Sequence, residues 1–254
     1  MIQISFFYKR RKKKIANGTL IIICVIFSSN DLFLLCLMFN TIQNLLVKEF
    51  TLEWRNRYAF NGIVVYSLIT VFTAFIAFKE VSPETWNALF WVILLFAAII
   101  TVSKSFMQEA RGRQLYYYTI ASPVAVIISK VIYNICFMLF VCLLCYATYS
   151  WFLGNPVIRR GYFITALVLG SVSMGAAFTL LSALASKTNS GALLMPVLSI
   201  PIIFPCIMVL IKLSKGAVDG LDPSIIMPNV MVLGALCVML VALAIILFPL
   251  IWKE

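Results

Sequence analysis

One stretch of the chain brings together several side chains that could bind another molecule. Residues 104–122 read KSFMQEARGRQLYYYTIAS, which places Glu109, Arg111, Arg113 and Gln114 close together, ahead of a run of tyrosines. Mixed charge beside apolar and aromatic residues suits a short helix that docks on a soluble partner. We therefore predict a partner-binding site at these four residues. A solvated loop with ordinary positive charge is the alternative that the sequence leaves open.

Most catalytic chemistry is excluded, because the chain contains no histidine. A general base or metal ligand of that type is lacking, and no GxxxxGK[ST] loop could hold the phosphates of ATP. Cys142 and Cys145 form a CxxC pair inside the apolar run FVCLLCYA, whereas a redox-active pair needs a polar or electropositive setting. We interpret both as small apolar residues of a membrane helix. The chain is predicted not to be an enzyme and to bind no metal or cofactor directly.

The composition excludes a soluble protein. Of the 254 residues, 63% are hydrophobic and 11% are charged, against about 25% charged residues in a soluble domain, and the mean hydropathy is +1.05. A membrane-spanning helix needs about 20 apolar residues, so the length allows at most about six or seven crossings. Much of the net charge of +11 comes from one basic run, residues 9–14. This is not the broad basic face of a nucleic-acid-binding protein, and no nucleic-acid partner is expected.

Long apolar segments predict an all-α polytopic membrane protein with six transmembrane helices. None of the segments has an acidic residue or a histidine in its core, although ion-coupled transporters need such groups inside the membrane. The third segment is the longest, and we expect Lys130 near its beginning to extend its ammonium group toward the interface. The predicted spans are residues 62–78, 86–103, 124–153, 163–186, 191–211 and 228–251.

An amphipathic helix is predicted ahead of the first span, at residues 40–61. Its apolar residues recur at helical spacing, and polar residues such as Lys48 and Glu49 surround them. Such a helix fits the membrane–water interface, and a soluble helix packed on a partner is the alternative. The apolar face consists of Ile42, Leu45, Leu46, Phe50 and Trp54.

The first 37 residues do not fit this organisation. A basic run leads into a short apolar run that SSND interrupts, and Asp31 would lie near the middle of any membrane helix there. A charge at that depth costs about 2.5–3.5 kcal/mol, and FSSND is a poor cleavage site for a signal peptide. We interpret residues 1–37 as an unstructured or non-native extension and residues 38–254 as a single six-span membrane domain.

The basic residues also predict an orientation. With the N-terminus of the domain inside, the inner loops hold more Lys and Arg than the outer loops, as the positive-inside rule requires. Both ends of the domain are then cytoplasmic, and residues 79–85, 154–162 and 212–227 are outside. The adjacent Arg159 and Arg160 oppose this assignment.

The fifth span contains Pro196, Pro201 and Pro205. Each proline removes a backbone hydrogen bond and bends a helix, which predicts a structural break able to move; a static kink is the alternative. In the fourth span, small residues at 171 and 175, and at 182 and 186, predict close helix packing. The partner is either another helix of the chain or another protein of the complex.

Three blocks of this sequence resemble one protein family, the CcmB family of haem exporter membrane subunits for cytochrome c maturation. They occur in that family's order and spacing, and the resemblance covers about residues 42–251. The blocks are LVKEFTLEWRNRYAFNGIVVYSLITV, SFMQEARGRQLYYYTIASPVAVIISKVIYN and LLSALASKTNSGALLMPVLSIPIIFPCIMVL.

The resemblance implies the membrane subunit of an ABC-type complex in the bacterial inner membrane. It implies three partners: a CcmA-like ATPase subunit that holds the ATP, a CcmC-like haem-handling membrane protein and a CcmE-like periplasmic haem chaperone. We also expect contact with membrane lipid and two copies of this chain in the complex. Haem is then a cargo of the complex. Haem ligands are usually His, Cys, Met or Tyr, so the lack of histidine favours transmission of ATP energy, with release of the loaded chaperone, over direct haem export.

Two other functions fit the composition. One is a generic ABC-2-type membrane subunit that exports a lipid or drug, and the other is a membrane scaffold that only assembles its partners. A membrane subunit without a nucleotide site must receive energy through a cytoplasmic surface. Two cytoplasmic segments are long enough, residues 40–61 and 104–122, and we predict that the second contacts the ATPase.

Overall fold

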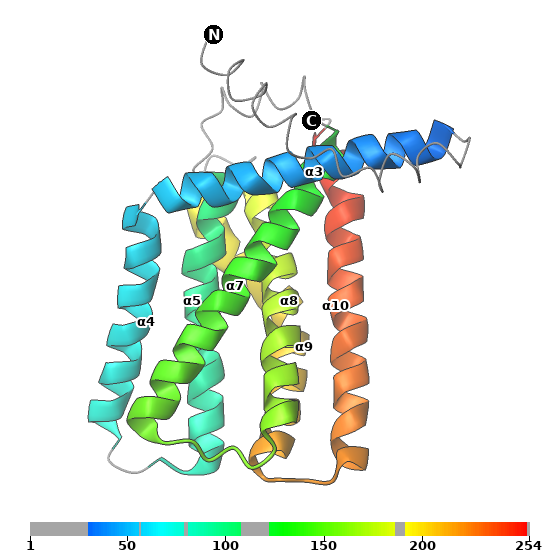
Figure 1. The fold of residues 1–254 in the computed structure, drawn as a ribbon. Helices are drawn as coiled ribbons and strands as arrows, with labels where there is room; N and C mark the ends of the chain where they lie inside the picture. The colour runs from blue at the N-terminus through cyan, green and yellow to red at the C-terminus, as the bar shows by residue number, and fades with distance from the viewer. Residues whose placement is uncertain (1–29, 56, 79–80, 108–121, 186–190, 253–254) are drawn as a thin grey trace, which may run out of the picture. The chain divides into compact units, whose positions relative to one another are not determined.

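The computed structural model describes residues 30–55, 57–78, 81–107, 122–185 and 191–252, and its regular structure there is entirely α-helical (Figure 1). Residues 1–43 and 44–254 form two separate compact units, and the packing described below lies within the second. The helices are α3 (Asn30–Arg55), α4 (Arg57–Ala77), α5 (Pro83–Met107), α7 (Pro123–Leu153), α8 (Arg160–Ala185), α9 (Gly191–Val218) and α10 (Pro223–Trp252).

Within the described ranges, five helices are long and apolar enough to cross a membrane. They confirm the prediction of an all-helical polytopic membrane protein. α4 adds a shorter apolar stretch, Asn61–Ala77, so the count of six spans depends on this helix and stays a prediction. The five longer stretches are Pro83–Thr101, Pro123–Leu153, Arg160–Ala185, Ser199–Val218 and Pro223–Pro249.

The ends of α7 follow from local sequence. The Ser122 hydroxyl accepts a hydrogen bond from the Ala125 backbone N–H at 3.3 Å, which satisfies one of the free donors at the helix start. Pro123 occupies the first turn, where its missing N–H costs nothing. The helix stops at Gly154, whose φ of 77° suits glycine. The predicted span 124–153 therefore matches this helix almost residue for residue.

Helix α8 occupies the centre of the bundle, in contact with α5, α7, α9 and α10. Its small residues permit this. A Cβ added at Gly175 would lie 3.0 Å from Ile135 Cα on α7, and one added at Gly170 would lie 2.9 Å from the Trp91 ring on α5. Gly175 and Ser171 are buried, so the partner predicted for these small residues is internal to the chain.

Three helix connections lie together at one end of the bundle (Figure 1). The indole N–H of Trp86 donates to the Gly154 carbonyl at 3.1 Å, which ties α5 to the α7–α8 connection. Arg159 Nε donates to the Gly220 carbonyl at 3.1 Å, which ties that connection to the α9–α10 turn. These connections belong to the three segments predicted to lie outside, and which side of the membrane they face stays a prediction.

The segment 212–227, expected as an outer loop, is mostly helical. α9 continues to Val218 and α10 begins at Pro223, which leaves only a short turn between them. The reason is amphipathicity: Leu213 and Ala217 are buried, whereas Lys212 is exposed. The lysines that suggested a loop lie on the outer face of the last helical turns.

The predicted helix 40–61 is divided between two helices. α3 ends at Arg55 and α4 begins at Arg57, so residues 57–61 belong to the first apolar helix. Leu45 packs against the core, whereas Val47 and Phe50, the second a member of the predicted apolar face, are exposed, so the amphipathic character of the helix stays a prediction. Its location in the membrane interface stays a prediction.

The other end of α3 lies inside the predicted extension, because the helix begins at Asn30. Residues 1–29 are outside the described part of the chain. The interpretation of residues 1–37 as an extension therefore stays a prediction.

Candidate functional site

The predicted partner-binding residues Glu109, Arg111, Arg113 and Gln114 lie outside the described residues. The helices on either side are described. α5 runs to Met107, α7 starts at Pro123, and the two helices contact one another. The segment therefore joins two packed helices directly.

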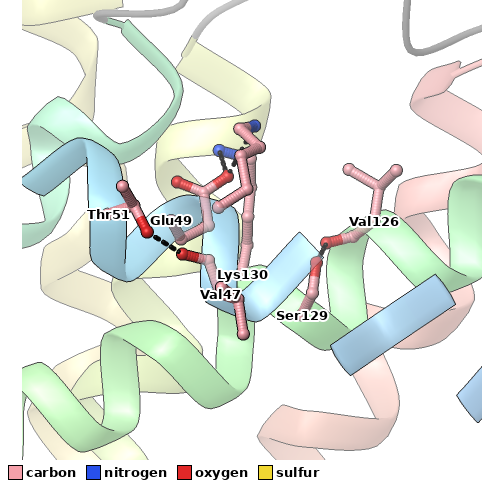
Figure 2. Close-up of polar contacts among 7 residues, drawn as sticks. Val47, Glu49, Thr51, Val126, Ser129 and Lys130 are labelled. Atoms are coloured by element: carbon pink, nitrogen blue, oxygen red, sulfur yellow. Dashed lines mark hydrogen bonds and ion pairs between the residues drawn. The ribbon is translucent and has the colours of Figure 1, made fainter. Parts of the chain in front are cut away.

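An ion pair links α7 to α3, about two turns after the start of α7. Glu49 Oε1 on α3 lies 3.5 Å from Lys130 Nζ on α7 (Figure 2). The Lys130 side chain is only 2% exposed and the Glu49 side chain 13%. The same carboxylate oxygen accepts a hydrogen bond from Lys48 Nζ at 3.0 Å. One carboxylate thus faces two ammonium groups, one on its own helix and one on α7.

Neighbouring hydroxyl groups are satisfied within their own helices. Ser129 donates to the Val126 carbonyl at 2.8 Å, and Thr51 donates to the Val47 carbonyl at 2.6 Å (Figure 2). Both hydroxyl groups thus donate to a backbone carbonyl one turn earlier in the same helix. Among the polar contacts drawn in Figure 2, the contact between α3 and α7 is therefore ionic.

A ring contact lies beside the ion pair. Phe50 and Tyr133 meet edge to face, with ring centroids 5.1 Å apart and an interplanar angle of 80°. Phe50 follows Glu49 in α3, and Tyr133 lies one turn beyond Lys130 in α7. We refer to these four residues as the α3–α7 joint.

Sequence patterns do not predict this joint. The Lys130 side chain is buried and pairs with a carboxylate of α3, and the expectation that it extends toward the membrane interface stays a prediction. A buried lysine is costly unless it is paired, so a lysine within an apolar helix is a signal that a partner is needed. The sequence does not indicate which acidic residue supplies it, because Glu49 is on a distant helix.

The three prolines of the predicted break all lie within α9, which is helical from Gly191 to Val218. Pro201 and Pro205 are exposed. They lie on a face of α9 that the described helices leave open to lipid or to another protein. The role of the prolines as a movable break stays a prediction.

The described residues contain no cluster of three or more His, Cys, Asp or Glu able to hold a metal ion. Cys142 and Cys145 are buried in α7, as expected for apolar helix residues. A groove between α4 and α7 has apolar walls apart from Ser67, whose hydroxyl donates to the Ile63 carbonyl at 2.9 Å. This groove offers packing surface rather than haem ligands.

Comparison with known families gives one match. The family model described as CcmB protein matches residues 40–250. The chain belongs to the CcmB family. No curated protein and no solved structure gives a significant match. The family match starts within α3 and ends within α10, so it includes the α3–α7 joint and all three prolines of α9.

Membership in the CcmB family establishes the general role of the chain. It is a multi-pass membrane subunit of the haem exporter for cytochrome c maturation, an ABC complex that contains an ATPase and other Ccm components. It is a transport subunit and not a catalytic enzyme.

Proposed function

We propose that this CcmB chain couples ATP hydrolysis on a separate ATPase subunit to release of the haem-loaded chaperone. The support is the position of residues 104–122 between two packed helices. α5 and α7 contact each other, and both contact α8 at the centre of the bundle. A force applied to the segment would therefore act on both helices and reach the core. The lack of histidine favours this role over direct binding of haem by the chain.

The proposed complex has its energy source on the cytoplasmic side. A CcmA-like subunit holds the ATP and contacts Glu109, Arg111, Arg113 and Gln114. Haem is the cargo and passes, with the help of a CcmC-like membrane protein, to a CcmE-like chaperone on the other side. Two copies of this chain lie in the bacterial inner membrane, with both ends of each in the cytoplasm.

The test is reversal of two charges, Glu109→Lys together with Arg113→Glu. Breaking a buried, hydrogen-bonded charge pair costs about 2–5 kcal/mol, whereas a charge at an interface rim contributes less. We expect the double variant to insert in the membrane but to lose the ATPase subunit, or to retain it without stimulating its turnover. Co-purification and ATP turnover of the reconstituted complex measure both effects.

The matched control is Arg160→Glu, because Arg160 is exposed at the opposite end of the bundle. It should assemble and turn over ATP as the wild type does. Wild-type assembly and turnover in the double variant would place the coupling surface elsewhere, with α3 as the next segment to test.

A further inference from the structure

The α3–α7 joint lies near the start of α7, close to the segment 104–122. Lys130 lies two turns after Ser122, the residue that caps α7 and ends the segment 104–122. A displacement of the first turns of α7 therefore moves Lys130 and Tyr133 directly. Both residues contact α3, through Glu49 and Phe50 respectively.

The contacts of the joint are better suited to fixing which residues of the two helices face each other than to adding stability. A ring contact alone permits one helix to shift along another, since a neighbouring apolar side chain can take the place of the ring. An ion pair between buried groups adds little net stability but can specify which residues face each other. Because Glu49 and Phe50 are adjacent and contact residues one turn apart on α7, the two contacts together define the register of α3 on α7.

We propose that Glu49 and Lys130 are positioning residues that fix the register of α3 on α7, so that α3 moves with α7 when the ATPase acts. This inference rests on the proposed function, in which residues 104–122 receive the force. Helix α3 is then a moving part of the exporter rather than a passive anchor. If the register were lost, the ATPase would stay bound and active, but its ATP hydrolysis would no longer drive release of the chaperone.

The reconstituted complex tests this with three variants: Glu49→Lys, Lys130→Glu and the exchange that carries both. The measured quantities are co-purified ATPase, ATP turnover and mature cytochrome c formed per ATP hydrolysed. For each single reversal we expect normal ATPase binding and a yield per ATP that falls about fivefold or more, within the usual range of coupling between sites. The exchange should recover at least half of the lost yield, because opposite charges again face each other.

Lys48→Gln is the matched control. Lys48 contacts the same carboxylate from the neighbouring position on α3, so this contact does not join the two helices, and its loss should leave the yield per ATP unchanged. If either single reversal folds poorly, Glu49→Gln replaces it, since this change keeps the shape of the side chain and removes the charge. The expected result is again a lower yield per ATP.

Three outcomes would overturn the proposal: an unchanged yield per ATP in the single reversals, an exchange that recovers nothing at normal protein level, or loss of the ATPase from the single variants. Failure of the proposed function looks different. In that case the double reversal at Glu109 and Arg113 has no effect, while the joint variants still lower the yield. The joint would then receive its movement from another contact.

Discussion

Trp91 of α5 donates its indole N–H to the hydroxyl of Ser214 on α9 across 2.7 Å, and both side chains are fully buried. Ser214 in turn donates to the Leu210 carbonyl at 2.7 Å. The indole therefore has a partner in surroundings that contain few polar groups. The bond ties α5 to a part of α9 that the distribution of charge suggests is a loop.

Ser214→Ala should weaken the fold because it leaves the buried indole N–H without its acceptor. An unmet buried donor costs about 1–3 kcal/mol, and hydrogen bonds between membrane helices average about 0.6 kcal/mol, so we expect a loss of about 1 kcal/mol. Ser171→Ala is the control, since Ser171 is equally buried but donates within its own helix, to Val168. Thermal unfolding in detergent measures both, and equal losses would contradict the prediction.

Substitution of two glycines should separate the packing of α8 from helix propensity. Gly175→Ala places a methyl group 3.0 Å from backbone atoms of Ile135, so α7 must shift, at a cost of about 1–3 kcal/mol. Gly234→Ala on α10 meets nothing within 4 Å and should be neutral, or stabilising by up to about 1 kcal/mol. The melting temperature should fall for Gly175→Ala and stay unchanged or rise for Gly234→Ala. Equal shifts would show that α7 and α8 are not packed this closely.

Sequence patterns predict the helices where local signals and apolar runs agree. α7 is the clearest case, since Ser122, Pro123 and Gly154 mark its ends. The patterns are less successful where contacts with residues distant in the sequence determine whether a segment is helical or which helices pair. The end of α9 contains lysines yet stays helical, because Leu213 and Ala217 pack inward. The pairing of α3 with α7 has no local signal either, since no spacing rule connects Glu49 with Lys130.

The orientation of the bundle can be tested by cysteine labelling in intact cells. A cysteine at Ser105, near the end of α5, is predicted to face the cytoplasm and to resist an impermeant thiol reagent. A cysteine at Arg160 lies at the opposite end and is exposed, so it should be labelled. The native cysteines that could react are first replaced. The reverse pattern of labelling would invert the topology and move residues 104–122 away from any cytoplasmic ATPase.

The prolines of α9 provide the last prediction. A proline inside a helix removes a hydrogen bond and allows bending, and Pro201 and Pro205 are exposed on α9, where they fill no packing position in the core. If their function is to let this helix bend, Pro201→Ala should impair cytochrome c maturation at unchanged protein level and unchanged or higher thermal stability. Pro228→Ala is the control, because Pro228 also lies inside a helix, α10, but outside the predicted break. Cytochrome c yield and membrane protein level are measured together. Normal maturation after simultaneous replacement of Pro196, Pro201 and Pro205 would show that these prolines form a static kink without a role in maturation.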